Sequence, residues 1–131
     1  MIALNDCVMV VDDEILNVMS LTAQLEDMGR LVCGDAASAQ EAVRLAVANR
    51  PNLILMDMRL EGEEDGVDAT LEIYDRVGSK VVFITASTDP TTMKRILSVN
   101  PVTVLTKPVS AQQLKVAVDE AFSGRHDRPV R

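Results

Sequence analysis

Five short apolar runs, each followed by a longer segment of helical periodicity, constrain the fold of this chain more than any other feature. Within each run the apolar residues are continuous rather than alternating with polar ones. This pattern is typical of strands that are buried on both faces, as in a parallel sheet. The expected strands cover residues 7–11, 31–33, 53–56, 81–84 and 102–105.

The segments between these runs carry helix signals at their ends. Ser38-Ala-Gln-Glu41 and Ser110-Ala-Gln-Gln113 both match the capping-box pattern. Asp89 followed by Pro90 is a typical helix start, because proline is well tolerated at the first helical position. The expected helices cover residues 15–28, 38–49, 67–77, 89–99 and 110–122.

Regular alternation of strands and helices predicts an α/β fold: a doubly wound, five-stranded parallel sheet with five helices on its two faces. The length of 131 residues fits one domain, expected at residues 1–122. Residues 123–131 lack an apolar stripe and hold Arg125, Arg128 and Arg131 against Asp127. We expect them to form a flexible basic tail.

Charge and composition exclude several classes of partner. The 20 acidic and 13 basic residues give a formal net charge of −7, which argues against nucleic acid as the main partner. An aromatic content of 2% leaves little for base stacking. No apolar run approaches the ~20 residues of a membrane span, and no secretory signal is apparent, so we expect a cytoplasmic protein without membrane insertion.

The two cysteines, Cys7 and Cys33, do not form a C-x-x-C pair. Their spacing gives no sign of a zinc or redox site. We expect two small buried thiols in a reducing compartment.

Polar residues stand directly after four of the apolar runs. Asp12-Asp13-Glu14 follows the first run, Asp57 the third, Thr85 the fourth, and Lys107 comes shortly after the fifth. Ligands of open parallel sheets bind outside the carboxyl ends of the strands. We therefore expect these side chains to meet in one crevice.

Three carboxylates packed together repel one another, and a bound hard cation removes that conflict. Oxygen ligands without histidine or cysteine suit Mg²⁺. A cation together with Lys107 and Thr85 would also accommodate an anion with several oxygens, such as a phosphoryl group. Asp57, alone at the end of a central strand, is the candidate nucleophile that would form an acyl phosphate.

Each of these residues has a simpler explanation when taken alone. The pair Asp12 and Asp13 would serve as a helix N-cap, Asp57 as a loop cap, and Lys107 as a solvated surface residue. The functional interpretation depends on the whole set lying at the same end of one sheet.

Four motifs occur in order along the chain: Val8-Met-Val-Val-Asp12-Asp13-Glu14, Leu53-Ile-Leu-Met-Asp57, Phe83-Ile-Thr85-Ala86 and Leu105-Thr-Lys107-Pro108. The ordered set resembles the receiver domain of response regulators in two-component signalling, of the chemotaxis-regulator type. The resemblance covers residues 6 to about 122. It implies a flavodoxin-like strand order 2-1-3-4-5 and a bacterial signalling switch.

The resemblance implies roles for the acidic residues. Asp57 resembles the phosphoacceptor, which takes a phosphoryl group from a histidine kinase or a histidine phosphotransfer protein. Asp13 resembles the direct Mg²⁺ ligand, and Asp12 resembles the acidic partner that acts through water. Arg59 stands where a backbone carbonyl completes the metal site.

The resemblance also implies how the switch works. Thr85 resembles the hydroxyl that moves to the phosphoryl oxygens, Lys107 resembles the lysine that pairs with them, and the Lys107–Pro108 bond is expected to be cis. Phosphorylation would repack the face of the fourth helix, fifth strand and fifth helix, which binds an unknown downstream protein. We expect a stand-alone response regulator or relay component that is not an enzyme beyond its own phosphorylation and dephosphorylation.

Two positions depart from the family pattern. Val104 replaces a frequent aromatic residue, which argues against an aromatic rotamer switch. The loop after Asp57 lacks a common proline at Glu61 and is one residue longer than usual.

Other functions remain open at this point. One is a receiver-like adaptor that works without phosphorylation, although such domains usually lose one of the residues retained here. Another is a phosphatase similar to haloacid dehalogenases, which carry Asp-x-Asp where this chain has Asp57 and Arg59. A flavodoxin-type nucleotide module would need a glycine-rich loop after the first strand, and none follows it.

Overall fold

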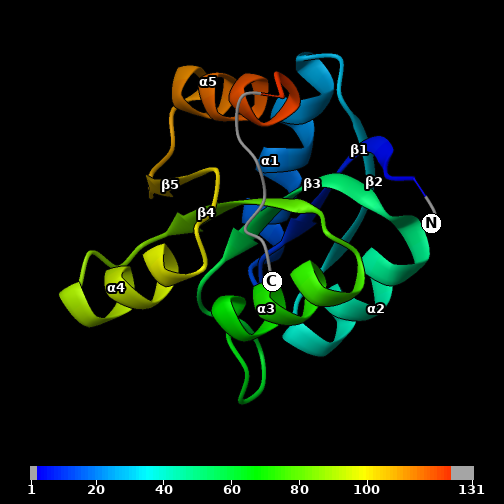
Figure 1. Ribbon diagram of the computed structural model, residues 1–131. Coiled ribbons are helices and arrows are strands. Elements are labelled where there is room, and N and C mark those ends of the chain that lie inside the picture. Colours follow the sequence, from blue (N-terminus) through cyan, green and yellow to red (C-terminus); the bar gives the residue numbers. More distant parts are fainter. Residues whose placement is uncertain (1–2, 125–131) are drawn as a thin grey trace.

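In the computed structural model, residues 3–124 are described, and they form one sheet with helices packed on both faces (Figure 1). The expected basic tail lies, apart from its first two residues, outside this range. The strands are β1 (Asn5–Val11), β2 (Leu31–Ala36), β3 (Pro51–Asp57), β4 (Lys80–Thr85) and β5 (Thr103–Thr106). The helices are α1 (Ile15–Asp27), α2 (Ala39–Asn49), α3 (Gly66–Arg76), α4 (Pro90–Ser98) and α5 (Ala111–Phe122).

The five strands are parallel and run in the order β2-β1-β3-β4-β5, which confirms the predicted topology. Helices α1 and α5 cover one face of the sheet, and α2 and α3 cover the other (Figure 1). Because every connection crosses from one parallel strand to the next through a helix, all strands end at the same edge.

The continuous apolar runs are explained by two separate cores. Along β1, Met9 and Val11 face α2 and α3, whereas Val8 and Val10 face α1 and α5. Successive side chains of a strand point to opposite faces. A strand covered on both sides therefore needs an apolar residue at every position.

Most predicted helix starts are confirmed by side-chain caps. The Ser38 hydroxyl accepts a hydrogen bond from the Glu41 amide, and Ser110 forms the predicted capping box with Gln113. Asp89 caps α4, with proline at the start of the helix. Helix α3 begins one residue before the expected position.

The expectation of two separate thiols is wrong, because Cys7 and Cys33 form a disulfide between β1 and β2. The residue pairing along these strands shifts between Val8 and Met9, so Cys33 is an extra residue in β2. The Cα atoms of the two cysteines are 5.8 Å apart, within the range that a disulfide spans. The cysteines thus give no support to a reducing compartment.

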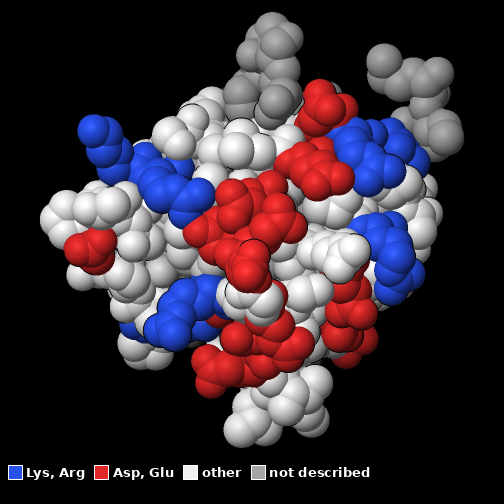
Figure 2. Space-filling view, turned by 90° about the horizontal axis from the view of Figure 1, so that it is seen from below, with Lys and Arg blue, Asp and Glu red and all other residues white. Residues whose placement is uncertain are grey.

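The face that carries α2 and α3 has Asp and Glu side chains gathered at its centre (Figure 2). This distribution agrees with the negative net charge and opposes binding of a polyanion on this face. Within residues 3–124, no helix combines the length and apolarity that a membrane crossing requires.

Gly66, at the start of α3, lies directly against the backbone of Asp57. Its amide donates a hydrogen bond to the Met58 carbonyl (2.8 Å), and a Cβ built on it would collide with the Asp57 carbonyl oxygen. Position 66 therefore requires glycine, because no side chain fits between it and the Asp57 backbone. This close contact fixes the start of α3 next to the end of β3.

We predict that Gly66→Ala lowers the free energy of unfolding by about 3 kcal/mol, because rigid backbone is the obstacle to the added methyl group. Gly62→Ala is the control, since its Cβ would meet nothing within 4 Å and only its φ of +89° opposes alanine. That change should cost about 1 kcal/mol. Urea unfolding measures both values, and equal losses would contradict the packing argument.

Candidate functional site

The carboxyl ends of the strands carry a pocket of about 620 Å³ that is rich in polar side chains. Asp57 is the last residue of β3, and Thr85 is the last residue of β4. Asp12 and Asp13 directly follow β1, and Lys107 directly follows β5. Residues that are distant in sequence therefore meet at one edge, as the sequence predicts.

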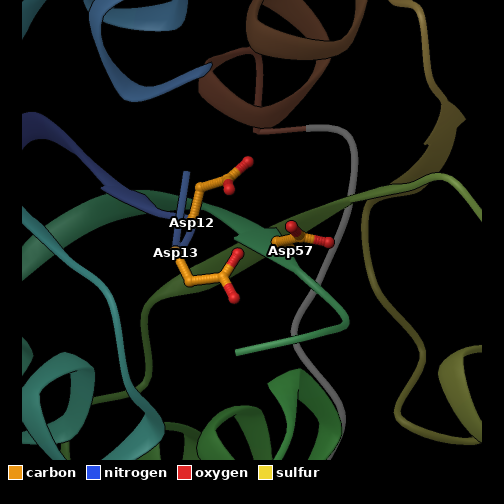
Figure 3. Close-up of side chains that lie close together, drawn as sticks. All are labelled: Asp12, Asp13 and Asp57. Carbon is orange, nitrogen blue, oxygen red and sulfur yellow. The ribbon is translucent and has the colours of Figure 1, made fainter. Parts of the chain in front are cut away.

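Three carboxylates form the centre of this edge (Figure 3). Asp12, Asp13 and Asp57 each offer one oxygen, and these oxygens lie within 4.8 Å of one another. Asp12 and Asp57 are buried, with 3% and 6% of their surface exposed, whereas Asp13 is exposed. Carboxylates this close repel one another unless positive charge is present.

Lys107 supplies positive charge to the two buried carboxylates. Its Nζ donates hydrogen bonds to Asp57 Oδ2 (3.0 Å) and to Asp12 Oδ2 (3.2 Å). The Lys107 amide donates to the Thr85 carbonyl (2.9 Å), which ties the lysine to the end of β4. The Lys107–Pro108 peptide bond is cis, as predicted.

The electrostatics of the site favour additional positive charge. Burial raises the pKa of Asp57; the Lys107 hydrogen bond lowers that pKa only in part, and the nearby Asp12 charge raises it further. Burial acts to lower the pKa of Lys107, but its contacts with Asp57 and Asp12 outweigh this and raise it overall. Among the described residues, none forms an ion pair with Asp13.

Backbone groups orient the carboxylates. Asp12 Oδ1 accepts a hydrogen bond from the Glu14 amide (2.9 Å), and Asp57 Oδ1 accepts one from the Arg59 amide (3.4 Å). The structure thus brings Arg59 next to Asp57 through its amide nitrogen. The role expected for the Arg59 carbonyl stays a prediction.

The Thr85 hydroxyl is engaged with its own loop. Thr85 is 2% exposed, and its Oγ1 accepts a hydrogen bond from the Ser87 amide (3.1 Å). The hydroxyl also donates to the Ser87 carbonyl (3.4 Å). Thr85 lines the pocket with Asp57, but the partner of its hydroxyl is Ser87 and not the Asp57 carboxylate.

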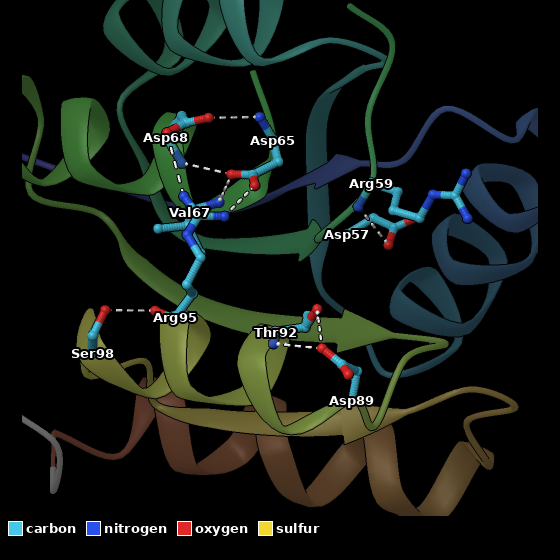
Figure 4. A network of polar contacts seen from close by, with 9 residues as sticks. All are labelled: Asp57, Arg59, Asp65, Val67, Asp68, Asp89, Thr92, Arg95 and Ser98. Carbon is cyan, nitrogen blue, oxygen red and sulfur yellow. Dashed lines mark hydrogen bonds and ion pairs between the residues drawn. The ribbon is translucent and has the colours of Figure 1, made fainter. Parts of the chain in front are cut away.

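Sequence reasoning missed Asp65, which lines the same pocket. Its Oδ1 caps α3 by accepting hydrogen bonds from the Val67 and Asp68 amides (3.0 and 3.1 Å), and its Oδ2 contacts the Arg95 guanidinium (Figure 4). Asp68 completes a capping box. The Asp-x-x-Asp spacing at the start of a helix is the signal that would have identified Asp65.

The charge state of Asp65 reflects these contacts. Partial burial acts to raise the pKa of Asp65. The hydrogen bond from Arg95, the amide of Asp68 and the charge of Arg95 outweigh burial and lower that pKa below its usual value. Asp65 is therefore an anion that is held firmly at the pocket wall.

Comparison with known proteins identifies relatives of this chain. The sequence profile of the response regulator receiver domain matches residues 8–119. The chain is 33% identical over 116 residues to the transcriptional regulatory protein PdtaR of Mycobacterium tuberculosis. That match covers 88% of this chain and 56% of the relative, so the chain spans about half the length of that protein.

Solved structures show the same fold. The signal receiver domain of a modulated diguanylate cyclase from Desulfovibrio desulfuricans superposes with a TM-score of 0.83 at 36% identity, covering 88% of this chain and 92% of that one. The receiver domain of sensor histidine kinase PA1611 from Pseudomonas aeruginosa superposes with a TM-score of 0.82 at 27% identity, covering 92% and 99%. That structure has a magnesium ion coordinated in its active site cleft.

We predict that Lys107→Met lowers the free energy of unfolding by about 1–3 kcal/mol, because it leaves two buried carboxylates without the ammonium group that pairs with them. Lys115→Met is the matched control, since Lys115 pairs with Asp119 on the surface at 2.7 Å. The control should cost no more than about 0.5 kcal/mol.

Both variants are measured by urea unfolding with EDTA and again with MgCl₂. Added Mg²⁺ should restore part of the stability of Lys107→Met, because a cation relieves the same repulsion. A loss in Lys107→Met no larger than in the control would show that the lysine does not hold the cluster together.

Proposed function

The chain belongs to the response regulator receiver domain family, and from this premise we propose that Asp57 accepts a phosphoryl group from a phosphohistidine. The donor is a histidine kinase or a histidine phosphotransfer protein. The observation that carries the proposal is a buried carboxylate, Asp57, at the centre of an acidic cluster and within hydrogen-bond distance of Lys107.

The transfer is a displacement at phosphorus. A carboxylate oxygen of Asp57 forms the new bond to phosphorus, the phosphorus–nitrogen bond of the donor breaks, and its electron pair stays on the imidazole nitrogen. Lys107 Nζ already bonds Asp57 Oδ2, which places its positive charge beside the carboxylate that would carry the phosphoryl group. Positioning and electrostatic stabilisation supply most of the catalysis in such transfers.

The residues present fit a magnesium ion. The donor set consists of oxygens alone: the carboxylates of Asp12, Asp13 and Asp57, which lie close together, and the carbonyl of Arg59. We propose that these groups hold Mg²⁺. When bound, the ion neutralises charge that develops on the phosphoryl oxygens. The magnesium ion in the PA1611 receiver domain supports this assignment.

Phosphorylation changes the hydrogen-bond preference of Thr85. A phosphoryl group carries roughly −1.5 to −2 charge and brings three strong acceptor oxygens into the pocket that Thr85 lines, and it replaces the single negative charge of the Asp57 carboxylate. We propose that the Thr85 hydroxyl leaves Ser87 and bonds the phosphoryl group, and that the following loop and α4 shift with it. Val104 on β5 has no ring to reorient, so this response does not need an aromatic rotamer change.

The proposed output is a change in affinity for a downstream protein. The face formed by α4, β5 and α5 exposes Leu97 (59%) and Val116 (55%), two large apolar side chains that a protein partner would cover. We propose that this face binds an effector protein. The cytoplasm, where histidine kinases present their phosphohistidine, is the proposed compartment.

The rival functions receive less support. An adaptor that ignores phosphorylation has no need for Lys107 to stand between Asp12 and Asp57, yet the lysine bonds both. A phosphatase similar to haloacid dehalogenases needs an acid two residues after the nucleophile. Arg59 stands there and contributes an amide.

We predict that incubation with Mg²⁺ and a small phosphodonor such as acetyl phosphate adds one phosphoryl mass to the protein, and that Asp57→Asn abolishes the addition because the amide is not a nucleophile. Asp35→Asn is the matched control, since Asp35 is an exposed acid in β2, which β1 separates from β3 in the sheet. It should be labelled like the unaltered protein. Intact-protein mass spectrometry measures the label, and equal labelling of Asp57→Asn would refute the assignment.

We predict that Asp13→Asn weakens Mg²⁺ binding about tenfold or more, because it removes a charged oxygen ligand. Glu14→Gln removes the same charge from the next residue, which is also exposed, and should have a smaller effect. Isothermal titration calorimetry with MgCl₂ measures both affinities. Equal weakening in the two variants would mean that Asp13 acts only through the overall charge of the pocket.

A further inference from the structure

Helix α4 is held to the rest of the protein by little apolar surface. Of its nine residues only Ile96 is buried, whereas α2 buries four of eleven and α5 four of twelve. Elements with few buried apolar contacts lie at the low-stability end of a fold and move most readily. Polar contacts therefore contribute a larger share of what positions α4.

Arg95 makes the main polar contacts between α4 and its neighbours (Figure 4). Its guanidinium contacts Asp65 Oδ2 and lies 3.5 Å from Asp68 Oδ1. Among the ion pairs within residues 3–124, these are the ones that tie α4 to another element. They join α4 to the start of α3.

Asp65 is in turn fixed to the phosphoacceptor strand. One of its oxygens caps α3, which leaves the other oxygen for Arg95. The next residue, Gly66, packs against the Asp57 carbonyl and bonds Met58. The backbone of Asp57 and Met58 therefore fixes the position of Asp65. Asp65 also lines the pocket into which a phosphoryl group on Asp57 would bring negative charge.

The other end of α4 is connected to Thr85 by a short chain of hydrogen bonds. The Ser87 amide donates to Thr85 Oγ1 (3.1 Å), and the Asp89 amide donates to Ser87 Oγ (3.2 Å). Asp89 caps the first turn of α4 through the Thr92 amide (3.1 Å). A movement of the Thr85 hydroxyl toward Asp57 thus displaces the start of a helix that Arg95 holds in its second turn.

We propose that the ion pairs of Arg95 with Asp65 and Asp68 are a latch that holds α4 in the arrangement of the unphosphorylated protein. The latch rests on the proposed function and concerns its regulation. In the structure that contains these ion pairs, the Thr85 hydroxyl bonds Ser87 and not Asp57. The ion pairs therefore stabilise the state in which Thr85 does not contact the phosphorylation site. Weakening the latch raises the population of the alternative state before any phosphate arrives.

The test compares Arg95→Gln with Arg76→Gln. Arg76 forms an exposed ion pair with Glu72 within α3 (3.2 Å), so the control loses a similar contact without touching α4. Two rates are measured: amide hydrogen exchange in α4 without phosphodonor, and phosphorylation of Asp57 by acetyl phosphate with Mg²⁺. Arg95→Gln should accelerate both by about two- to fivefold, the range that corresponds to loss of a partly exposed ion pair.

A double variant isolates the contact itself. Asp65→Asn keeps an oxygen that can cap α3 but loses the charge that attracts Arg95. In that background Arg95→Gln should change the two rates less than it does in the unaltered protein. Equal effects in both backgrounds would mean that Arg95 acts through something other than Asp65, which overturns the latch.

The outcomes separate the latch from the proposed function. If the unaltered protein takes no label at Asp57, the proposed function fails. If it is labelled and Arg95→Gln is no faster than Arg76→Gln, only the latch fails. Faster exchange in α4 without faster phosphorylation also overturns the latch, because the ion pair is then merely structural.

Discussion

The structure depends on one electrostatic constraint: two buried carboxylates, Asp12 and Asp57, lie close enough to share a single lysine ammonium. Such a pair is unfavourable without positive charge. Lys107 supplies this charge from the residue that follows β5, a strand two places away from β3 in the sheet. Asp13 adds a third carboxylate for which the described residues offer no ion pair. The cluster is thereby suited to bind a cation and to exchange the lysine contact for one with a phosphoryl group.

The fold meets this constraint by dividing rigid from movable parts. Strands β1 and β3 are buried on both faces, and Gly66 fixes the start of α3 against Asp57, so the acidic cluster is held in place. On the other side, α4 buries one residue and is connected to Thr85 through Ser87 and Asp89. A change of charge at the acidic cluster can therefore move α4, which is weakly attached to the rest of the fold.

Much of the fold and of the site could be predicted from the sequence. Doubly buried strands leave continuous apolar runs, and the residue after each run must lie at the sheet edge, which locates Asp57 and Thr85. Contacts that depend on an irregular strand pairing, or on which surface charges meet, could not be predicted. The Cys7–Cys33 disulfide needs the extra residue in β2, and β2 extends to Ala36 through Gly34 and Asp35, which carry no apolar signal. The Arg95 contact joins surface residues 30 positions apart, and surface charges carry no periodicity that reveals a partner.

The central claim is that Asp57 itself becomes the acyl phosphate. Sodium borohydride reduces an aspartyl phosphate to the corresponding alcohol, so the reacted position is marked as homoserine. After incubation with Mg²⁺ and acetyl phosphate, reduction and tryptic digestion, tandem mass spectrometry should find this change at position 57, in the peptide that ends at Arg59. A mark at Asp12 or Asp13 with position 57 unchanged would contradict the account.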